Sequence, residues 1–391
     1  MISRWRYRGG VRLTCDSVQL ARALGAVARA IPARTALPVL GMVLLETSAD
    51  GVFLSATNLE LSIRRRIGAS VAAEGAIAVP GRLLADYAGA LPPEPLDLEL
   101  DRPQQRLRLR SNSFKAEIHG VAADEFPPAP TVDGGACLEL PAHRLVEAIS
   151  DTLAAASTDE ARPVLTGIRL QVSGGRLRLV ATDGYRLAVR EVGVGENHKA
   201  DAWAVTVPAR TMSEVVRILR GAGEADVAMT ISPAGNHVVF RAPDAEIASR
   251  VIDGTFPDAG RLVPGKHLTG VTLAATELSH RLRALAPFAQ GSANVVRLEA
   301  TAGSVALAAA ANDVGSARTD LDAEVIGPDL AVAFNARFLL DCPALASDGR
   351  VELRLHGSMG PIVVVRTIED GFLYLFMPVR TYPLGSTTLA S

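Results

Sequence analysis

The chain of 391 residues repeats one order of motifs three times, and this repeat limits the possible fold more than any other feature. Leu40 and Leu165 end matching Pro-Val-Leu segments and lie 125 residues apart. Pro208 and Asn335 each stand just before a predicted helix and lie 127 residues apart. Several such matches in one order and at nearly one period indicate a threefold internal duplication. The period is too long for a solenoid unit, so each copy is predicted to be a whole domain.

The clearest local pattern lies in the second copy, over residues 177–189. Apolar residues alternate with arginines on both sides of Asp183-Gly184, which predicts two strands joined by a tight turn. Elsewhere apolar residues recur at helical spacing. The helices are predicted at 17–31 and from 81 in the first copy, at 142–157 and around 212–219 in the second, and at 277–288 and around 338–345 in the third. Each domain is therefore predicted to be α+β, with two helices on one side of roughly eight antiparallel strands.

Pro- and Gly-rich stretches separate the copies and are predicted to be linkers. They lie at 127–135 and 257–265. We therefore expect an N-terminal extension at 1–9, a first domain at 10–131, a second at 132–264, and a third at 265–391 that includes a C-terminal tail.

Composition argues against several classes of protein. The formal net charge is −2, so an anionic partner would need a local concentration of arginine. The three cysteines are far apart, and the seven histidines show no metal-binding spacing, so we expect neither disulfides nor a metal site. No apolar run reaches membrane-spanning length and the basic N-terminus lacks the apolar core of a signal peptide. A cytoplasmic protein is expected.

One motif imitates a nucleotide-binding loop. Residues 260–267, Gly-Arg-Leu-Val-Pro-Gly-Lys-His, match the G-x4-G-K spacing, but His267 replaces the hydroxyl that would hold magnesium, and Pro264 removes an amide donor. A nucleotide-dependent enzyme that uses this segment is an open but disfavoured alternative. Asp159, Glu160 and Asp183 lack an accompanying nucleophile with an ordered base, so no catalytic site is predicted.

Arginines on the predicted helices admit two interpretations. Each one alone suits a solvated helix face, whereas together they could form a basic lining for phosphates. Those on the helices include Arg22, Arg29 and Arg217.

Three motifs in this threefold repeat resemble the bacterial DNA polymerase III β subunits, the sliding clamps. They are Leu37–Leu40, Ala181–Ala188 and Tyr374–Arg380, supported by Phe256-Pro257-Asp258 with Arg261, and the resemblance extends from about Val11 to Arg380. It implies a head-to-tail homodimer, closed into a ring around duplex DNA, with helices lining the hole. It also implies a processivity factor for DNA replication that has no catalytic site and no cofactor.

The resemblance further implies three sets of residues. Partner peptides from the replicative polymerase, the clamp loader and other clamp-binding proteins would share a pocket at Leu165, Thr182, Gly184, Tyr185, Arg186, Leu187, Pro257, Arg261, Leu262, Pro361, Leu375, Met377 and Pro378. Double-stranded DNA would be contacted without regard to sequence by Arg34 and Arg162, with Arg22, Arg29 and Arg217 as helix candidates. The dimer contact would involve Phe114, Ala116 and Ile118 on one side and Pro287 and Phe288 on the other.

Three features depart from the family pattern. Tyr185 stands where histidine is common, Leu262 and Leu375 are bulkier than valine, and residues 381–391 extend beyond the usual terminus. A specialised second clamp copy, with an altered pocket, is therefore one alternative. A scaffold that never encloses DNA is another.

Overall fold

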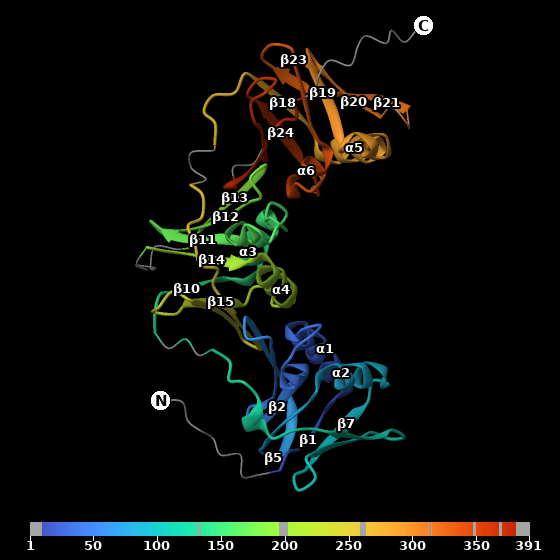
Figure 1. The fold of residues 1–391 in the computed structure, drawn as a ribbon, viewed down its shortest axis with the longest axis vertical. Helices are drawn as coiled ribbons and strands as arrows, with labels where there is room; N and C mark the ends of the chain where they lie inside the picture. Colours follow the sequence, from blue (N-terminus) through green and yellow to red (C-terminus); the bar gives the residue numbers. More distant parts are fainter. Residues whose placement is uncertain are drawn as a thin grey trace. The chain divides into compact units, whose positions relative to one another are not determined.

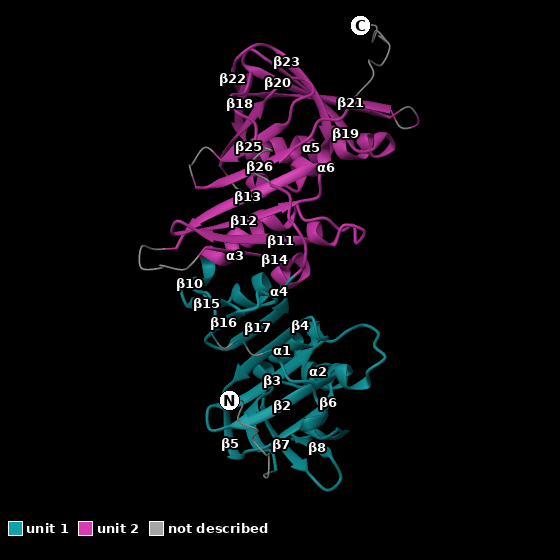
Figure 2. Cartoon of the chain, turned by 60° about the vertical axis from the view of Figure 1, so that its left-hand side comes forward, with its two compact units in different colours: residues 1–143, 214–251 teal, residues 144–213, 252–391 magenta. Residues whose placement is uncertain are grey.

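A computed structural model describes residues 10–130, 132, 134–194, 202–258, 263–311, 313, 315–346, 349–366 and 370–380. The chain divides into two compact units, which are treated separately. Unit 1 contains residues 1–143 and 214–251, and unit 2 contains residues 144–213 and 252–391 (Figure 2).

The first repeat lies within unit 1 (Figure 2). Its helices are α1 (Ser17–Val27), α2 (Gly81–Ala90) and the 3-10 turns η1 (Ala28–Ala30), η2 (Pro38–Gly41) and η3 (Ala123–Glu125). Its strands are β1 (Arg12–Asp16), β2 (Met42–Ser48), β3 (Gly51–Thr57), β4 (Leu61–Ile67), β5 (Ala69–Ala73), β6 (Ala76–Pro80), β7 (Pro95–Asp101), β8 (Arg106–Arg110) and β9 (Lys115–His119). The side chain of Asp16 accepts a hydrogen bond from the backbone N–H of Gln19 at 2.8 Å, which caps α1 at the start that the sequence predicts.

The second repeat is divided between the two units. Its helices are α3 (Ala142–Leu153), η4 (Pro163–Thr166) and α4 (Ala209–Leu219). Its strands are β10 (Cys137–Pro141), β11 (Gly167–Ser173), β12 (Arg176–Thr182), β13 (Arg186–Gly193), β14 (Trp203–Pro208), β15 (Asp226–Ile231), β16 (His237–Ala242) and β17 (Ala245–Arg250).

The third repeat lies within unit 2. Its helices are α5 (Ala275–Ala289), η6 (Gln290–Ser292), α6 (Ala336–Leu340) and η7 (Pro343–Ala346). Its strands are β18 (Thr269–Ala274), β19 (Val295–Thr301), β20 (Ser304–Ala311), β21 (Gly315–Asp322), β22 (Glu324–Ile326), β23 (Leu330–Asn335), β24 (Arg350–Leu355), β25 (Ile362–Arg366) and β26 (Phe372–Phe376). Asn335 caps α6 by accepting a hydrogen bond from the N–H of Arg337 at 2.9 Å.

Two sheets cross from one repeat to the next. In unit 1 an eight-stranded sheet runs β10-β15-β16-β17-β4-β3-β2-β6, so the last strand of the second repeat pairs with β4 of the first. In unit 2 a nine-stranded sheet runs β14-β11-β12-β13-β26-β25-β24-β18-β22, so the last strand of the third repeat pairs with β13 of the second. The joints between repeats therefore consist of backbone hydrogen bonds between strands. For this reason each compact unit contains one whole repeat together with the part of the second repeat that pairs with it.

The α+β prediction is confirmed in its main features. Paired strands are antiparallel throughout the described residues, and α1 and α2 lie side by side over the strands of unit 1 (Figure 1). Apolar positions predicted from helical spacing, such as Leu20 and Leu24 of α1, are fully buried. The prediction is wrong for Leu83, which is 55% exposed because the buried face of α2 contains Leu84 and Ala88. Helix α1 ends at Val27, and the 3-10 turn η1 continues the predicted 17–31 segment to Ala30. Helix α3 ends at Leu153, four residues before the predicted end.

Candidate functional site

The turn between β12 and β13 is built by two short polar side chains. Thr182 Oγ1 accepts a hydrogen bond from the N–H of Gly184 at 3.1 Å and donates one to the carbonyl of Arg186 at 2.6 Å. Asp183 Oδ1 accepts hydrogen bonds from the N–H groups of Tyr185 and Arg186, both at 2.9 Å. Gly184 has φ of +95°, a conformation that glycine adopts without steric cost, so the predicted Asp-Gly turn is confirmed.

The first repeat builds the same turn from different residues. Thr57 Oγ1 accepts from the N–H of Leu59 at 3.0 Å and donates to the carbonyl of Leu61 at 3.1 Å. Asn58 Oδ1 accepts from the N–H groups of Glu60 and Leu61 at 3.0 and 2.7 Å. Leu59, in the place of glycine, has φ of +75°. The turn is therefore a scaffold shared by the first two repeats, and it forms without an arginine at its end.

In the second repeat the arginine at the end of this turn is held on several sides. Arg186 forms ion pairs with Asp183 at 3.0 Å and with Asp341, just after α6, at 2.7 Å. Its guanidinium carbon lies 5.1 Å from the ring centre of Phe338, and Nη1 lies 3.5 Å from the hydroxyl of Tyr374. Burial would lower the pKa of Arg186, but Tyr374 and the two carboxylates raise it above its ordinary value. The side chain therefore stays charged and tied to the third repeat.

Beside this turn lies an apolar cluster shared by the second and third repeats. Its buried members come from β12, β13, β25 and β26, and half-buried side chains pack on them. The cluster contains Val180, Leu187, Val189, Val363 and Leu375, with Phe256, Val263, Val365 and Leu373 against it. Tyr185 and Met377 stand near its edge with exposed fractions of 63% and 42%, and the N–H of Met377 donates to the carbonyl of Tyr185 at 2.8 Å. Exposed apolar side chains over a buried apolar base suit an apolar ligand.

The structure brings the two central segments of the predicted pocket together and leaves part of it undescribed. Strands β13 and β26 pair Arg186 with Phe376 and Leu187 with Leu375. Of the other predicted residues, Leu165 and Thr182 are buried, Pro361 and Pro378 are half-buried, and Gly184 and Pro257 are exposed. Arg261 and Leu262 lie outside the described residues, as does the tail at 381–391.

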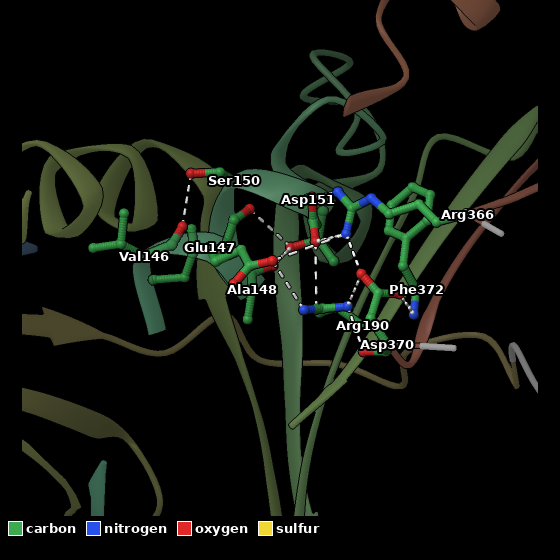
Figure 3. Close-up of polar contacts among 11 residues, drawn as sticks. Val146, Glu147, Ala148, Ser150, Asp151, Arg190, Arg366, Asp370 and Phe372 are labelled. Carbon is green, nitrogen blue, oxygen red and sulfur yellow. Dashed lines mark hydrogen bonds and ion pairs between the residues drawn. The ribbon is translucent and has the colours of Figure 1, made fainter. Parts of the chain in front are cut away.

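A buried ion cluster joins the same two repeats farther along β13 (Figure 3). Arg190 lies 3.3 Å from Asp151 of α3 and 2.7 Å from Asp370, and its side chain is 8% exposed. Arg366 of β25 contacts the same two carboxylates, each at 2.6 Å. Glu147 adds a third carboxylate, 3.0 Å from Arg190. Two guanidinium groups and three carboxylates thus fix α3 against the third repeat.

The two aspartates of the cluster respond differently to burial. Burial raises the pKa of Asp151 above its ordinary value, against the opposing hydrogen bond and charge of Arg366. Burial would also raise the pKa of Asp370, but hydrogen bonds from Arg366 and from the N–H of Phe372 bring it below its ordinary value. Asp370 therefore stabilises the fold above its unfolded pKa, and this contribution is lost as the pH falls through the lowered one.

Removing one partner of the cluster should be costly. We expect Arg366→Ala to lower the free energy of unfolding by about 3 kcal/mol, because Asp151 stays buried with less of its charge compensated. Urea unfolding followed by circular dichroism measures the change. In the matched control Arg176→Ala, the pair with Glu191 is lost from an arginine whose side chain is 69% exposed, and the cost should stay below about 1 kcal/mol. Equal costs for the two variants would contradict the assignment.

The arginines predicted to face DNA are all exposed. Arg29 and Arg217 share one carboxylate, that of Glu214, each at 3.5 Å. Arg162 is paired with Asp159 at 3.4 Å and donates to the carbonyl of Asp183 at 3.3 Å. Arg22 and Arg34 form no ion pair with the described part of the chain, which leaves their charges available to phosphate.

The residues predicted at the dimer contact lie on α5 and on β9, except Phe114, which directly precedes β9, and their exposure differs. Phe114 and Pro287 are exposed, and Ala116 and Phe288 are half-buried. Ile118 is only 4% exposed, because its side chain packs inside its own repeat. Among the described strands, β9 and β21 each end a sheet and have a neighbour on one side only.

Three family models match consecutive parts of the chain. They are described as the N-terminal, central and C-terminal domains of the DNA polymerase III beta subunit, and they match residues 11–130, 139–258 and 260–380. The chain belongs to the DNA polymerase III beta subunit family.

Similar proteins span nearly the whole chain. A beta sliding clamp of Synechococcus elongatus is 33% identical over 95% of this chain and 99% of its own length, and one of Staphylococcus epidermidis is 28% identical over 90% and 95%. Among solved structures, a DNA polymerase sliding clamp from Bacillus subtilis has a TM-score of 0.88 at 25% identity, covering 95% of this chain and 100% of its own. A Pseudomonas aeruginosa clamp bound to griselimycin has a TM-score of 0.89 at 26% identity, with the same coverage.

Membership of the beta subunit family makes this protein a sliding clamp, a processivity factor and not an enzyme. The nucleotide-binding alternative is not favoured, and the local structure argues against it. Lys266 and His267 lead into strand β18, whereas a phosphate-binding loop leads into a helix. Gly260, Arg261 and Leu262 of that segment lie outside the described residues. None of the helices described in the structure is long and apolar enough to cross a membrane.

Two residues that hold Arg186 in place at the candidate site were not predicted from the sequence. Asp341 and Phe338 follow no recognisable motif, so nothing in the sequence connects them with Arg186. For Arg190 a signal was present, because it interrupts an apolar strand exactly one repeat, 125 residues, after Arg65. Arg65 pairs with Asp244 at 2.7 Å at the equivalent joint of unit 1.

Proposed function

We propose that this beta subunit works as a head-to-tail homodimer that encircles duplex DNA and presents the apolar cluster, Tyr185 and Met377 to partner peptides. In this proposal the three domains comprise residues 10–131, 132–264 and 265–391. The main support for the proposal is that both joints between domains are built by the same strand pairing. One further joint of the same kind can then form between two chains.

Both joints within the chain follow one rule. The last strand of a repeat pairs with the second strand of the hairpin in the repeat before it: β17 pairs with β4, and β26 pairs with β13. In the third repeat the equivalent hairpin strand is β21, and in the first repeat the equivalent last strand is β9. Both end their described sheets. Pairing of β21 with β9 of a second copy repeats the rule and satisfies the unpaired backbone groups of both edges.

The helices support the same arrangement. Near the end of α3, Asp151 contacts Arg366 on β25 of the following repeat. The equivalent helix of the third repeat is α5, whose end carries Pro287 and Phe288. The strand equivalent to β25 in the first repeat is β8, which pairs with β9. These residues of α5 therefore belong against the β8–β9 hairpin of a second copy, which makes a heterologous contact that closes into a ring.

DNA is held by enclosure rather than by tight contact. The formal net charge is −2, and Glu214 partly neutralises Arg29 and Arg217. Contacts from Arg22 and Arg34 to phosphate carry no sequence information and are screened by salt, which permits sliding. The partners are double-stranded DNA, the replicative polymerase, the clamp loader and other proteins with apolar clamp-binding peptides, and the location is cytoplasmic.

Retention on DNA of defined topology tests this function. We expect the protein, once loaded onto nicked circular DNA by a clamp loader, to stay bound through gel filtration in high salt. Linearising the circle should release it, because an enclosing ring slides off a free end. Equal retention on circular and linear DNA would indicate ordinary binding instead. Loss from both at low salt would favour a scaffold that never encloses DNA.

A further inference from the structure

We propose that Arg186 is a positioning residue of the partner site, which locks the 182–186 turn of the second repeat onto α6 of the third and thereby places Tyr185 opposite Met377. This inference rests on the proposed function of the site and deepens it. It reassigns Arg186, which the family resemblance places among the residues that line the pocket.

The first repeat serves as an internal control for this role. Its 57–61 turn makes the same four hydrogen bonds with Leu61 in place of the arginine. An arginine is therefore not required to close the turn. In the second repeat the arginine adds a set of contacts to the third repeat. Leu61, at the equivalent position of the first repeat, has an apolar side chain that cannot form ion pairs.

The contacts of Arg186 leave little of it for a ligand. Its side chain is 14% exposed, and two carboxylates occupy Nε and Nη1 at 3.0 and 2.7 Å. The Phe338 ring lies 5.1 Å from the guanidinium carbon, and the Tyr374 hydroxyl, which itself donates to the carbonyl of Phe338 at 2.9 Å, lies beside Nη1. The guanidinium thus faces the third repeat.

Backbone hydrogen bonds of the turn link Arg186 to the two exposed residues, Tyr185 and Met377. Arg186 donates its own N–H to Asp183, whose Oδ1 also holds the N–H of Tyr185. The carbonyl of Tyr185 in turn accepts the N–H of Met377 at 2.8 Å. Because Tyr185 is 63% exposed, little packing holds its backbone, and the Arg186 contacts to Asp183 and Asp341 supply the restraint.

A double-mutant cycle on Arg186 and Asp341 separates positioning from direct ligand contact. The probe is a synthetic peptide carrying Leu and Phe, in one form with an acidic residue and in one without, and its affinity for the full chain is measured by calorimetry. We expect Asp341→Ala to weaken binding about threefold to fivefold and Arg186→Ala about tenfold, with both peptide forms affected alike. The double variant should bind no more weakly than Arg186→Ala alone.

Two further measurements make the result specific. Hydrogen exchange at the amides of Tyr185 and Arg186 should speed up in Asp341→Ala, although Asp341 lies in another repeat. The matched control is Glu191→Ala, which removes the 3.3 Å pair with Arg176 at the far end of the same hairpin and should leave both affinity and exchange unchanged.

The outcomes are distinct. If Asp341→Ala leaves binding unchanged or tightens it for the acidic peptide alone, Arg186 contacts the ligand directly and the inference is overturned, while the proposed function stands. If the unaltered protein binds neither peptide, the proposed partner site itself is wrong, and the role of Arg186 falls with it.

Discussion

Phe288→Asp should convert the proposed dimer into a monomer. Phe288 is half-buried at the end of α5, where the repeat rule places the β8–β9 hairpin of a second copy. A carboxylate buried there without a partner costs about 3–5 kcal/mol, which weakens dimerisation by a factor of about 100 or more. Analytical ultracentrifugation over a range of protein concentrations measures the change. An unaltered dimer would contradict the assigned interface.

The control for this experiment comes from the first repeat. Leu59 is a similarly apolar residue, 52% exposed, in a turn that takes no part in the proposed contact. Its φ of +75° suits aspartate better than leucine, so Leu59→Asp should leave both the fold and the dimer intact. Ile118→Asp is unsuitable as an interface probe, because Ile118 is buried in its own repeat and its loss would unfold that repeat.

A chain that ends at Phe376 should lose peptide binding and still form the proposed dimer. Phe376 and Tyr374 are fully buried and complete β26, so the sheet survives the truncation. Met377 and Pro378 are removed, and with them the hydrogen bond from Met377 to Tyr185 and the apolar side chain beside the cluster. Binding of a Leu- and Phe-bearing peptide should fall by about 100-fold or more, since several apolar contacts of about 1 kcal/mol each disappear together.

A second truncation distinguishes the site from the tail. A chain that ends at Arg380 retains Met377 and keeps the hydrogen bond from the N–H of Val379 to the carbonyl of Ala333. It should bind the peptide as the full chain does if residues 381–391 take no part. Loss of binding in both truncated chains would move the partner site to the tail. Undiminished binding in the chain that ends at Phe376 would contradict the site altogether.

The fold was predictable because its signals are local and occur more than once. Asp16 and Asn335 cap helices from adjacent positions, and the Asp183-Gly184 turn depends on the conformational freedom of one glycine. The matching positions Leu40 and Leu165 are buried in both copies. In a repeated sequence, a strong local pattern in one copy supports the prediction made from a weaker pattern at the matching position of another copy.

The candidate site was predictable only in part, because several residue pairs that hold it together lie far apart in the sequence. The exposed residues Tyr185 and Met377 belong to motifs, so resemblance finds them. Asp341 lies 155 residues from Arg186, and Arg366 lies 215 residues from Asp151. Such pairs leave no periodic trace, and only the folded chain brings them together.

The sheets that cross between repeats have a consequence for synthesis of the chain. Asp244, the partner of Arg65 on β4, lies 179 residues farther along the chain, and Tyr374, a partner of Arg186 on β13, lies 188 residues farther along. At about 5–20 residues per second, each of these strands keeps an open hydrogen-bonding edge for roughly 10 to 40 seconds after it leaves the ribosome. Such edges are templates for aggregation. The nascent protein should therefore depend on chaperones until its last strand emerges. In the proposed dimer, β21 stays open for longer still, until a second chain pairs with it.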